Sequence, residues 1–354
     1  MERSALLEVH QARGVRLAAR PEAPALAAPL LFGDVPAEYR AGREGCALLD
    51  ASDRGLVRVG GPEASDFLHR LLANHVKPLA AGSGNANLLL SPKGKVLFAF
   101  ELQRHAEGFE LSIPPGHGAA LAAALERYHF AEKLTLADAS AEHAPLECLG
   151  PRTGDVLARL VGRAPELAPF QWVELDWNGA PLRLQRLGDG ALRLDAGAAG
   201  AARLWDALRA AGATPTGLVA RDCLRVESGR ALFGVDVDEN VYPQEAGLEQ
   251  AFALDKGCYV GQEVVAKIDT YGGLNKRLLT LAVEHSDPVA RGTPLVRVED
   301  GERRELGLVT SWAYSFALET GLVLAYVKRQ HQAPGTVFEL GASGARATLV
   351  PPPR

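Results

Sequence analysis

The sequence predicts an α+β fold built from antiparallel sheets and helices, followed by a smaller all-β part at the C-terminal end. Three observations lead to this prediction. The chain has 354 residues, too many for one ordinary hydrophobic core. Up to Ile268, strand-like and helix-like segments mix without the regular β-α-β alternation of a parallel sheet. Beyond Tyr271, short strand-like runs are separated by Gly, Pro and Asp, which indicates a small β-barrel or sandwich.

The first regular elements follow Gly45. Residues 46–61 alternate apolar and polar side chains, which predicts strands. A helix comes next, and Pro62 suits its first turn. Four residues at helical spacing form its expected core face: Phe67, Leu68, Leu71 and Leu72.

A β-hairpin is predicted after this helix. Its two strand-like runs, residues 85–90 and 95–103, are joined by the turn formers of Ser91-Pro-Lys-Gly94. A strand over 109–113 and an Ala-rich helix over 117–128 follow. This part of the chain therefore reads as an antiparallel sheet covered by helices.

The second half of the chain again mixes predicted helices and strands, and only strands are predicted after Tyr271. Residues 153–170 predict a helix and a loop, residues 172–194 predict short strands, and the helix over 202–211 ends at Gly212. Tyr271-Gly-Gly273 should end the next helix, within a linker over 269–274. Five barrel strands are expected, over 277–284, 293–298, 306–311, 321–327 and 337–340. The predicted parts are an N-terminal extension over 1–44, a region of two subdomains over 45–268 and a β-barrel over 275–350.

Composition excludes several classes of function. The formal charge is −5, from 38 basic and 43 acidic residues, so the protein has no overall positive potential that would attract a nucleic acid. The charged N-terminus lacks the apolar run of a secretory signal, and no segment reaches the length of a membrane span. The four cysteines form no CxxC pair, so neither a metal site nor a disulfide framework is predicted. We expect a cytoplasmic protein with reduced thiols.

The segment from Lys256 to Ile268 is the most informative for chemistry. Cys258 stands between two glycines, and Gly261 suits the N-cap of a helix that starts at Gln262. The positive end of that helix and the nearby Lys256 would favour the thiolate. Cys258 is thus the best nucleophile or redox candidate, although a buried structural thiol is an equally open interpretation. The other three cysteines are interpreted as packing residues.

The segment from Arg221 to Glu245 is dense in charge. Arg221 and Arg225 are four residues apart and are expected on one helix face. Because a guanidinium holds a carboxylate with two hydrogen bonds, one of them suits a dicarboxylate ligand tail. Pairing with Asp222 or Glu227 is the alternative. The acidic cluster of Asp236, Asp238 and Glu239 is interpreted as solvated turn charges.

At these motifs the sequence resembles a known family. Lys256-Gly-Cys-Tyr-Val-Gly-Gln-Glu263 resembles the signature of the YgfZ folate-binding family, which is related to the glycine-cleavage T-protein (GcvT, an aminomethyltransferase). Further segments resemble parts of T-protein: residues 60–64, 220–229, 236–240, 243–246 and 307–311. The resemblance implies a GcvT-like folate-binding core of two antiparallel α+β subdomains around a central opening, plus a C-terminal β-barrel. It also implies tetrahydrofolate as the cofactor.

The resemblance also implies roles for single residues. The position of Arg221 is expected to meet the glutamate tail of tetrahydrofolate. Phe233 stands where relatives usually have Tyr and would offer a stacking face. Cys258 would be the redox or transfer thiol, with Lys256, Tyr259 and Gln262 of the same signature around it.

One departure bears on the reaction. T-proteins resemble one another in a Gly-Gly-x-x-Asp-Asp stretch after the hairpin turn, whereas this chain has Gly94-Lys-Val-Leu-Phe-Ala99, so that Phe98 and Ala99 replace the carboxylates. General acid-base help is worth roughly 100- to 10,000-fold, so we expect no glycine-cleavage activity.

Three hypotheses for the function follow from the resemblance. The leading one is a YgfZ-like protein that binds tetrahydrofolate and supports assembly or repair of iron-sulfur clusters in client enzymes, with iron-sulfur client or assembly proteins as partners. The alternative is a folate-dependent one-carbon transferase acting on aminomethyl groups or methylamines. A folate-sensing adaptor without turnover is the third.

Overall fold

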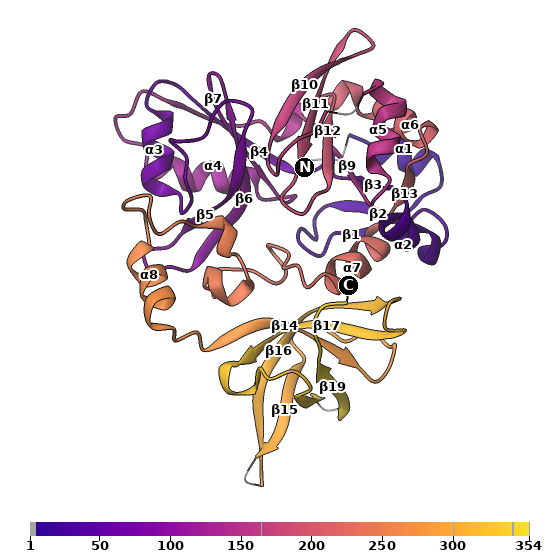
Figure 1. Cartoon of the computed structure of the whole chain (residues 1–354), viewed down its shortest axis with the longest axis vertical. Helices are drawn as coiled ribbons and strands as arrows, with labels where there is room; N and C mark the ends of the chain where they lie inside the picture. The colour runs from indigo at the N-terminus through magenta and orange to yellow at the C-terminus, as the bar shows by residue number, and fades with distance from the viewer. Residues whose placement is uncertain (1–4, 164, 300, 342, 354) are drawn as a thin grey trace. The chain divides into compact units, whose positions relative to one another are not determined.

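A computed structural model describes residues 5–163, 165–299, 301–341 and 343–353 (Figure 1). The chain divides into two compact units. Unit 1 comprises Met1–Leu89, Phe98–Ala220 and Gln250–Val260, and unit 2 comprises Leu90–Leu97, Arg221–Glu249 and Gly261–Arg354. The predicted α+β class with a C-terminal β-barrel is confirmed.

One six-stranded sheet of unit 1 has the order β10-β11-β12-β9-β3-β13, and its pairs are antiparallel except for β13 with β3. Its strands are β3 (Ala47–Asp50), β9 (Leu146–Leu149), β10 (Trp172–Trp177), β11 (Ala180–Arg186), β12 (Leu192–Asp195) and β13 (Thr214–Thr216). Helices α1 (Leu7–Ala12), α5 (Thr153–Val161) and α6 (Ala201–Ala210) contribute to its apolar core, which contains the fully buried Leu48, Leu184 and Trp205.

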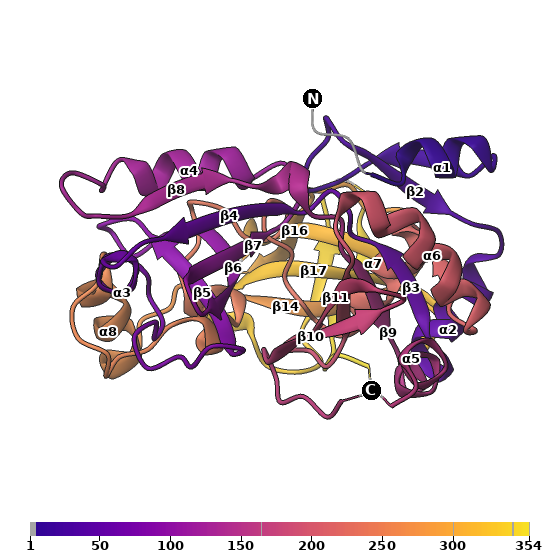
Figure 2. The same ribbon diagram turned by 90° about the horizontal axis from the view of Figure 1, so that it is seen from above.

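The second sheet of unit 1 has five strands in the order β5-β6-β7-β4-β8. They are β4 (Gly55–Gly60), β5 (Gly84–Leu90), β6 (Val96–His105), β7 (Gly108–Ile113) and β8 (Thr135–Asp138). Helix α3 (Ala64–Leu71) packs against β7, and α4 (Gly118–Glu126) lies along β4 and β8 (Figure 2). The predicted hairpin is β5 and β6. Pro62, however, lies before α3 rather than in its first turn, because Glu63 is the N-cap.

The N-terminal residues form regular structure of their own in unit 1. β1 (Arg16–Ala19) and β2 (Ala27–Leu31) make a two-stranded sheet, and α2 (Val35–Glu44) follows them. Just after β1, the buried Arg20 binds the carboxylate of Asp53 through two guanidinium nitrogens. This ion pair ties the β1–β2 hairpin to the segment between β3 and β4.

The β-strands of unit 2 close into a six-stranded barrel of order β14-β17-β16-β15-β18-β19. They are β14 (Lys276–Val283), β15 (Pro294–Glu299), β16 (Glu302–Ser315), β17 (Thr320–Lys328), β18 (Val337–Leu340) and β19 (Ala345–Leu349). Five of them were expected from the sequence. The sixth, β19, pairs with both β18 and β14 and thereby closes the barrel rather than leaving a sandwich.

Helices α7 (Leu218–Glu227) and α8 (Gln262–Tyr271) each contain part of one of the two sequence motifs. As predicted, α8 begins after Gly261 and ends before Gly272. Five short 3-10 helices complete the described part: η1 (Ser140–Glu142), η2 (Ala198–Gly200), η3 (Pro243–Ala246), η4 (Glu249–Ala251) and η5 (Arg329–His331).

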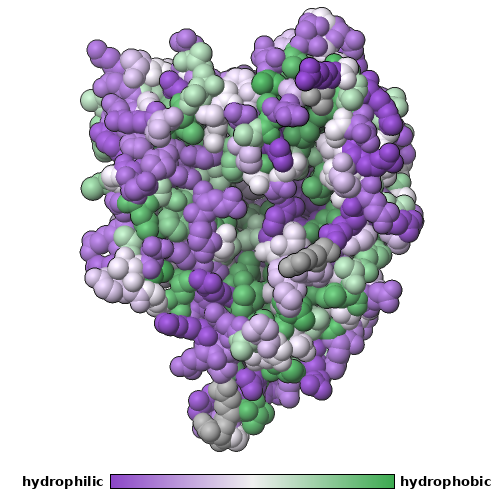
Figure 3. All heavy atoms as spheres, viewed as in Figure 1, coloured by the Kyte–Doolittle hydropathy of each residue, from purple (hydrophilic) through white to green (hydrophobic). Residues whose placement is uncertain are grey.

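The surface of unit 1 over α3 and α5 is largely hydrophilic in the space-filling view (Figure 3). Within the residues that the structure describes, none of the helices combines the length and the apolar character required to cross a bilayer.

Candidate functional site

Cys258 is the exposed one of the four cysteines, all of which lie in the described part of the chain. Cys46, Cys148 and Cys223 are buried, as expected of packing residues. Burial also raises the pKa of Cys223 to about 12, which keeps it a neutral thiol. The interpretation of Cys258 as a buried structural thiol is therefore wrong, and its sulfur is accessible for chemistry.

Lys256 has structural partners that the sequence did not indicate. Its Nζ donates to the backbone carbonyls of His69 and Leu72, at 2.5 Å each. These carbonyls lie at the C-terminal end of α3, where the last carbonyl groups of a helix lack intrahelical partners and attract a cation. Burial lowers the pKa of Lys256 to about 8. Lys256 thus anchors its segment to α3, and its predicted effect on the thiol stays a prediction.

Tyr259 is the second inward-facing residue of the signature. It is 7% exposed, and the Lys256 Nζ lies 5.1 Å from its ring centroid. Burial raises the pKa of Tyr259 to about 12, so its phenol is neutral. Lys256 and Tyr259 hold the segment from inside unit 1 while Cys258 between them is exposed. Between Lys256 and Cys258, Gly257 has a φ of 92°, a conformation that favours glycine.

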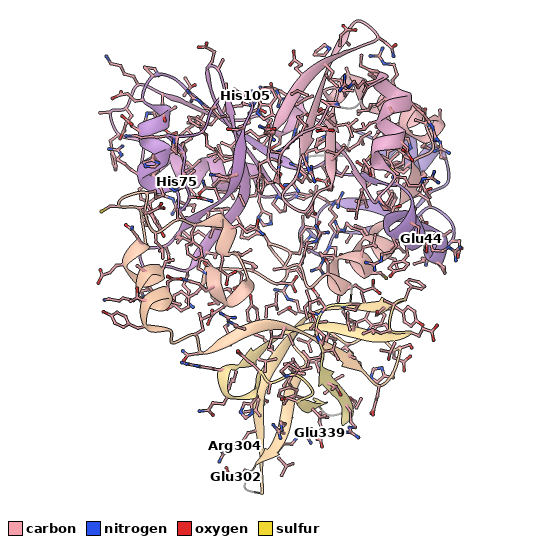
Figure 4. All side chains as sticks on the ribbon, in the orientation of Figure 1. Glu44, His75, His105, Glu302, Arg304 and Glu339 are labelled. Atoms are coloured by element: carbon pink, nitrogen blue, oxygen red, sulfur yellow. The ribbon has the colours of Figure 1, made fainter. Side chains whose placement is uncertain are left out.

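The residues that follow α3 hold the same segment at further points. The Ala253 amide donates to the Ala73 carbonyl at 2.9 Å, and the Asn74 side-chain amide donates to the Gln250 carbonyl at 2.8 Å. His75 lies on the same side of unit 1 as α3 (Figure 4), with its Nε2 3.1 Å from Asp255 Oδ1. The segment over 250–260 is therefore pinned along its length.

His69 and His75 contact the segment that contains Cys258, which the sequence did not indicate. His69 Nε2 lies 3.1 Å from the Lys256 carbonyl oxygen, and its Nδ1 accepts from the Val76 amide at 3.3 Å. Burial and the nearby Lys256 lower the pKa of His69. No local pattern could have placed these histidines, because about 180 residues separate them from the cysteine segment.

In unit 2, the hairpin turn and the start of α8 meet through two glycines. A Cβ added to Gly261 would lie 2.5 Å from the Ser91 carbonyl oxygen and 3.0 Å from the Gly94 Cα. A Cβ added to Gly94 would lie 2.9 Å from the Val264 Cβ. The backbones can approach this closely only because neither position has a side chain. Gln262, the next residue of the signature, is the first residue of α8 and is half-buried.

Arg225 on α7 is committed to the structure of unit 2. It is buried, and its Nη1 donates to Asp236 Oδ2 at 2.7 Å and to the Arg230 carbonyl at 2.9 Å. Its Nη2 donates to Ser311 Oγ on β16 at 2.9 Å. Arg225 therefore joins α7, the loop that follows it and the barrel.

Asp236 is not a solvated turn charge, as the sequence analysis expected. It is 2% exposed and also accepts from Thr310 at 2.5 Å, from Ser311 at 2.6 Å and from the Leu232 amide at 2.9 Å. The sequence pattern placed it in a polar turn, but the barrel covers that turn.

Arg221, one turn before Arg225, has a different environment. Its side chain is 21% exposed, and its ion pair with Asp222 spans 3.4 Å. Asp222 is shared, since Arg225 Nε donates to the same carboxylate oxygen at 3.2 Å. Both the predicted helix face and the predicted pairing with Asp222 are present. Of the two arginines, Arg221 has the more exposed side chain, 21% against 9% for Arg225.

Two further sequence positions take part in unit 2. Phe233 is partly buried in the loop after α7 and forms a β-bridge with Val237. Lys95, directly after the hairpin turn, places its Nζ 3.2 Å from the Tyr242 ring centroid and 3.0 Å from the Asn240 carbonyl oxygen. Such a cation over an aromatic face is a stabilising contact that sequence reasoning did not foresee.

The predicted site residues thus form two groups. Lys256, Cys258 and Tyr259 lie together in unit 1, whereas Arg221, Phe233 and Gln262 belong to unit 2. Phe98 and Ala99, which stand in place of carboxylates, are partly buried on β6. In the described part, no cluster of three or more His, Cys, Asp or Glu side chains is arranged to hold a metal ion.

Comparisons with known proteins agree on one family. The profile of the GCVT N-terminal domain matches residues 9–256, and that of the glycine cleavage T-protein C-terminal barrel domain matches residues 276–354. An aminomethyltransferase of Rubrobacter xylanophilus is 32% identical, with 92% of this chain and 87% of the relative covered. One of Symbiobacterium thermophilum is 31% identical, with 96% and 93% covered.

A solved structure matches the fold over nearly the whole chain. The glycine cleavage system aminomethyltransferase T of Bartonella henselae superposes with a TM-score of 0.85 at 24% identity. The match covers 98% of this chain and 96% of that structure.

Proposed function

The chain belongs to the glycine cleavage T-protein family, and from that premise we propose that it binds tetrahydrofolate and transfers one-carbon units. Tetrahydrofolate is the cofactor of this family, as the sequence resemblance implied. The observation that carries the proposal is the match of both family domains, over residues 9–256 and 276–354. The relatives are named aminomethyltransferases, which favours one-carbon transfer over the iron-sulfur hypothesis of the sequence analysis.

The residues of α7 fit the acidic tail of a folate. A glutamate tail needs a guanidinium that is reachable and held in place. Arg221 meets both requirements, because its side chain is partly exposed and Asp222 contacts it from the same helix. Arg225 does not, because its hydrogen bonds to Asp236, Arg230 and Ser311 occupy it within the protein. Arg221 would therefore hold the tail.

The chemistry must differ from that of T-proteins with paired aspartates. Phe98 and Ala99 offer no group that takes up or donates a proton. We expect turnover with aminomethylated lipoyl H-protein at least about 100-fold below that of a relative that has the carboxylates. The double variant Phe98→Asp with Ala99→Asp should raise that turnover if the missing carboxylates are the cause.

Calorimetric titration with tetrahydrofolate tests the binding proposal directly. Arg221→Ala should weaken the affinity at least about tenfold, since a charge-assisted pair with a carboxylate is lost. Lys267→Ala is the matched control, because Lys267 is an exposed cation on α8 whose partner is Glu263. Absence of tetrahydrofolate binding by the unaltered chain would refute the proposal, and so would equal effects of the two variants.

One observation favours support of iron-sulfur cluster assembly or repair as a second candidate function. The exposed Cys258 sits on a segment that Lys256 and Tyr259 anchor from inside. A soft thiolate suits iron-sulfur chemistry, but a cluster normally takes four such ligands, so client or assembly proteins would supply the rest. This candidate places the protein in the cytoplasm, where thiols stay reduced.

Cys258→Ser separates the two candidates in cells that lack the native gene. If the second candidate is right, this variant loses its support of iron-sulfur enzymes while its tetrahydrofolate affinity is unchanged. If one-carbon transfer is right, Cys258→Ser behaves in these cells like the unaltered chain. Arg221→Ala is then the variant that loses function, because its tetrahydrofolate affinity is reduced.

A further inference from the structure

Unit 1 contains a cavity of about 390 Å³ that none of the predicted site residues lines. Its walls come from α1, α2, α6 and β13 and from the segments after α1 and after β2. Small-molecule sites have volumes of about 300–1,000 Å³ and combine apolar walls with a few placed polar groups. The cavity has the size of such a site, and three of its features specify a ligand.

The first feature is a buried histidine with one unsatisfied nitrogen. His10 is 0% exposed and lines the cavity, and its Nε2 lies 3.0 Å from Asp50 Oδ2. Although burial alone would raise the pKa of Asp50, hydrogen bonds from His10 and Ser52 lower it, so Asp50 is ionised and accepts. Because an ionised carboxylate only accepts, His10 Nε2 carries a proton and donates to Asp50. The second ring nitrogen, Nδ1, accepts a hydrogen bond when it carries no proton. Nδ1 has no hydrogen-bond partner among the described residues, which is costly for a buried polar atom.

The second feature is an aromatic wall around His10. The ring centroids of Phe32 and Trp205 lie 5.3 and 4.9 Å from that of His10, both in edge-on arrangements. Phe32 and Trp205 are 5.5 Å apart with an interplanar angle of 31°. Both also line the cavity. Flat aromatic molecules pack favourably against such faces and edges.

The third feature is a pair of arginines that share one carboxylate. Arg13 Nη2 lies 2.8 Å from Asp206, and Arg209 Nη1 lies 3.6 Å from the same carboxyl group. Two guanidinium charges and one carboxylate leave one positive charge. Arg13 and Arg209 line the cavity and are about two-fifths exposed, so a ligand anion can reach them.

Two acidic residues also line the cavity, but backbone amides engage both of them. Glu38 accepts from the amides of Phe32, Gly33 and Gly217, at 2.7 to 3.0 Å. Asp34 caps α2 by accepting from the Ala37 amide. Both oxygens of Glu38 and Oδ2 of Asp34 are thus engaged by the backbone, and the two arginines are the cationic groups of the lining.

We propose that this cavity binds a small aromatic acid, whose ring packs against Phe32 and Trp205. A hydroxyl or ring N–H of the ligand donates to His10 Nδ1, and its carboxylate binds Arg209. This site is separate from the proposed folate function and involves different residues.

Titration calorimetry of the full chain with 3-(4-hydroxyphenyl)propionate tests the proposal. The acid should bind, and its 4-methoxy analogue, which cannot donate to His10, should bind at least about tenfold more weakly. The matching propanamide lacks the anion and should also bind about tenfold more weakly. Arg209→Gln should reduce the affinity for the acid to that for the amide, without changing the affinity for the amide.

Arg221→Ala is the control that separates this site from the folate proposal, because it should leave binding of the acid unchanged. Three results would overturn the inference: no binding of the acid at millimolar concentration, equal affinities for the hydroxy and methoxy compounds, or an Arg209→Gln variant that binds the acid as the unaltered chain does.

Discussion

Residues that lie close together in this chain have different tasks. Arg221 and Arg225 share one helix and one aspartate, yet the side chain of Arg221 is 21% exposed and that of Arg225 only 9%. Lys256 and Cys258 are two residues apart, and the lysine is buried against α3 while the thiol is exposed. At the scale of the residue, function therefore depends on what a side chain contacts, and residue type alone does not decide it.

Lys256 should make stability depend on pH in alkaline solution. Its folded-state pKa of about 8 lies below the ordinary value of 10.5. Between these two values the unfolded chain binds more protons than the folded chain, so Lys256 makes stability rise with pH from about 8 to 10.5. Lys256→Met should remove this rise, measured as the urea midpoint at several pH values. Lys267→Met, which removes an exposed cation, should keep the rise of stability with pH. A plot of the urea midpoint against pH that runs parallel for Lys256→Met and the unaltered chain would contradict the role of Lys256 in this rise.

At the scale of the element, the signature segment and the hairpin turn are built for close packing. The turn over 91–94 leaves room for the start of α8 only because Gly94 and Gly261 lack side chains. Gly261 is also the N-cap of α8 and has a φ of 82°, a conformation that favours glycine. Glycine is therefore required there both by the backbone conformation and by the close contact with the turn.

Alanine substitutions of Gly257 and Gly261 distinguish the cost of backbone strain from the cost of a steric clash. Gly257→Ala should cost about 1–2 kcal/mol, because its φ is 92° but its added Cβ meets nothing within 4 Å. Gly261→Ala has the same strain and a Cβ 2.5 Å from the Ser91 carbonyl oxygen, so it should cost clearly more. Urea unfolding of both variants measures the difference. Equal losses of stability would show that the contact between turn and helix is looser than described.

At the scale of the whole molecule, a polar seam joins the two sheets of unit 1. Arg193 on β12 binds Glu101 on β6, Arg183 on β11 binds Glu110 on β7, and Gln103 on β6 donates to Gln185 on β11 at 2.6 Å. His105 on β6 lies beside β10 in Figure 4, and its ring centroid is 4.3 Å from that of Trp172. Charged and amide groups thus connect the two sheets.

This seam should weaken in acid. Burial alone would raise the pKa of Glu110, but His105, Arg183 and Arg58 hold it well below its ordinary value of 4.5. Its contribution to stability is present above pH 4.5 and is lost as the pH falls further. Glu110→Gln should flatten the fall of the urea midpoint between pH 5 and pH 3. Glu174→Gln, a change at an exposed residue of β10, should leave the fall of the urea midpoint unchanged. If the urea midpoints of both variants fell equally steeply with pH, the proposed role of Glu110 in the seam would be wrong.

Much of the fold follows from local pattern in the sequence. Hydrophobic periodicity and turn residues predicted the α+β class, the hairpin around Ser91–Gly94, both ends of α8 and five of the six barrel strands. The motif around Cys258 also pointed to the exposed thiol. Helices, strands and turns of this kind depend on a few neighbouring residues, so they can be predicted from a single sequence.

Other features were decided only by tertiary structure. The partners of Lys256 lie more than 180 residues away in sequence, the burial of Asp236 depends on the barrel, and the cavity at His10 is assembled from several elements. The sequence by itself determined which elements form and which residues carry reactive groups. Tertiary structure determined which of those groups are exposed, paired or enclosed, because desolvation and hydrogen bonding depend on distances between segments that periodicity does not encode.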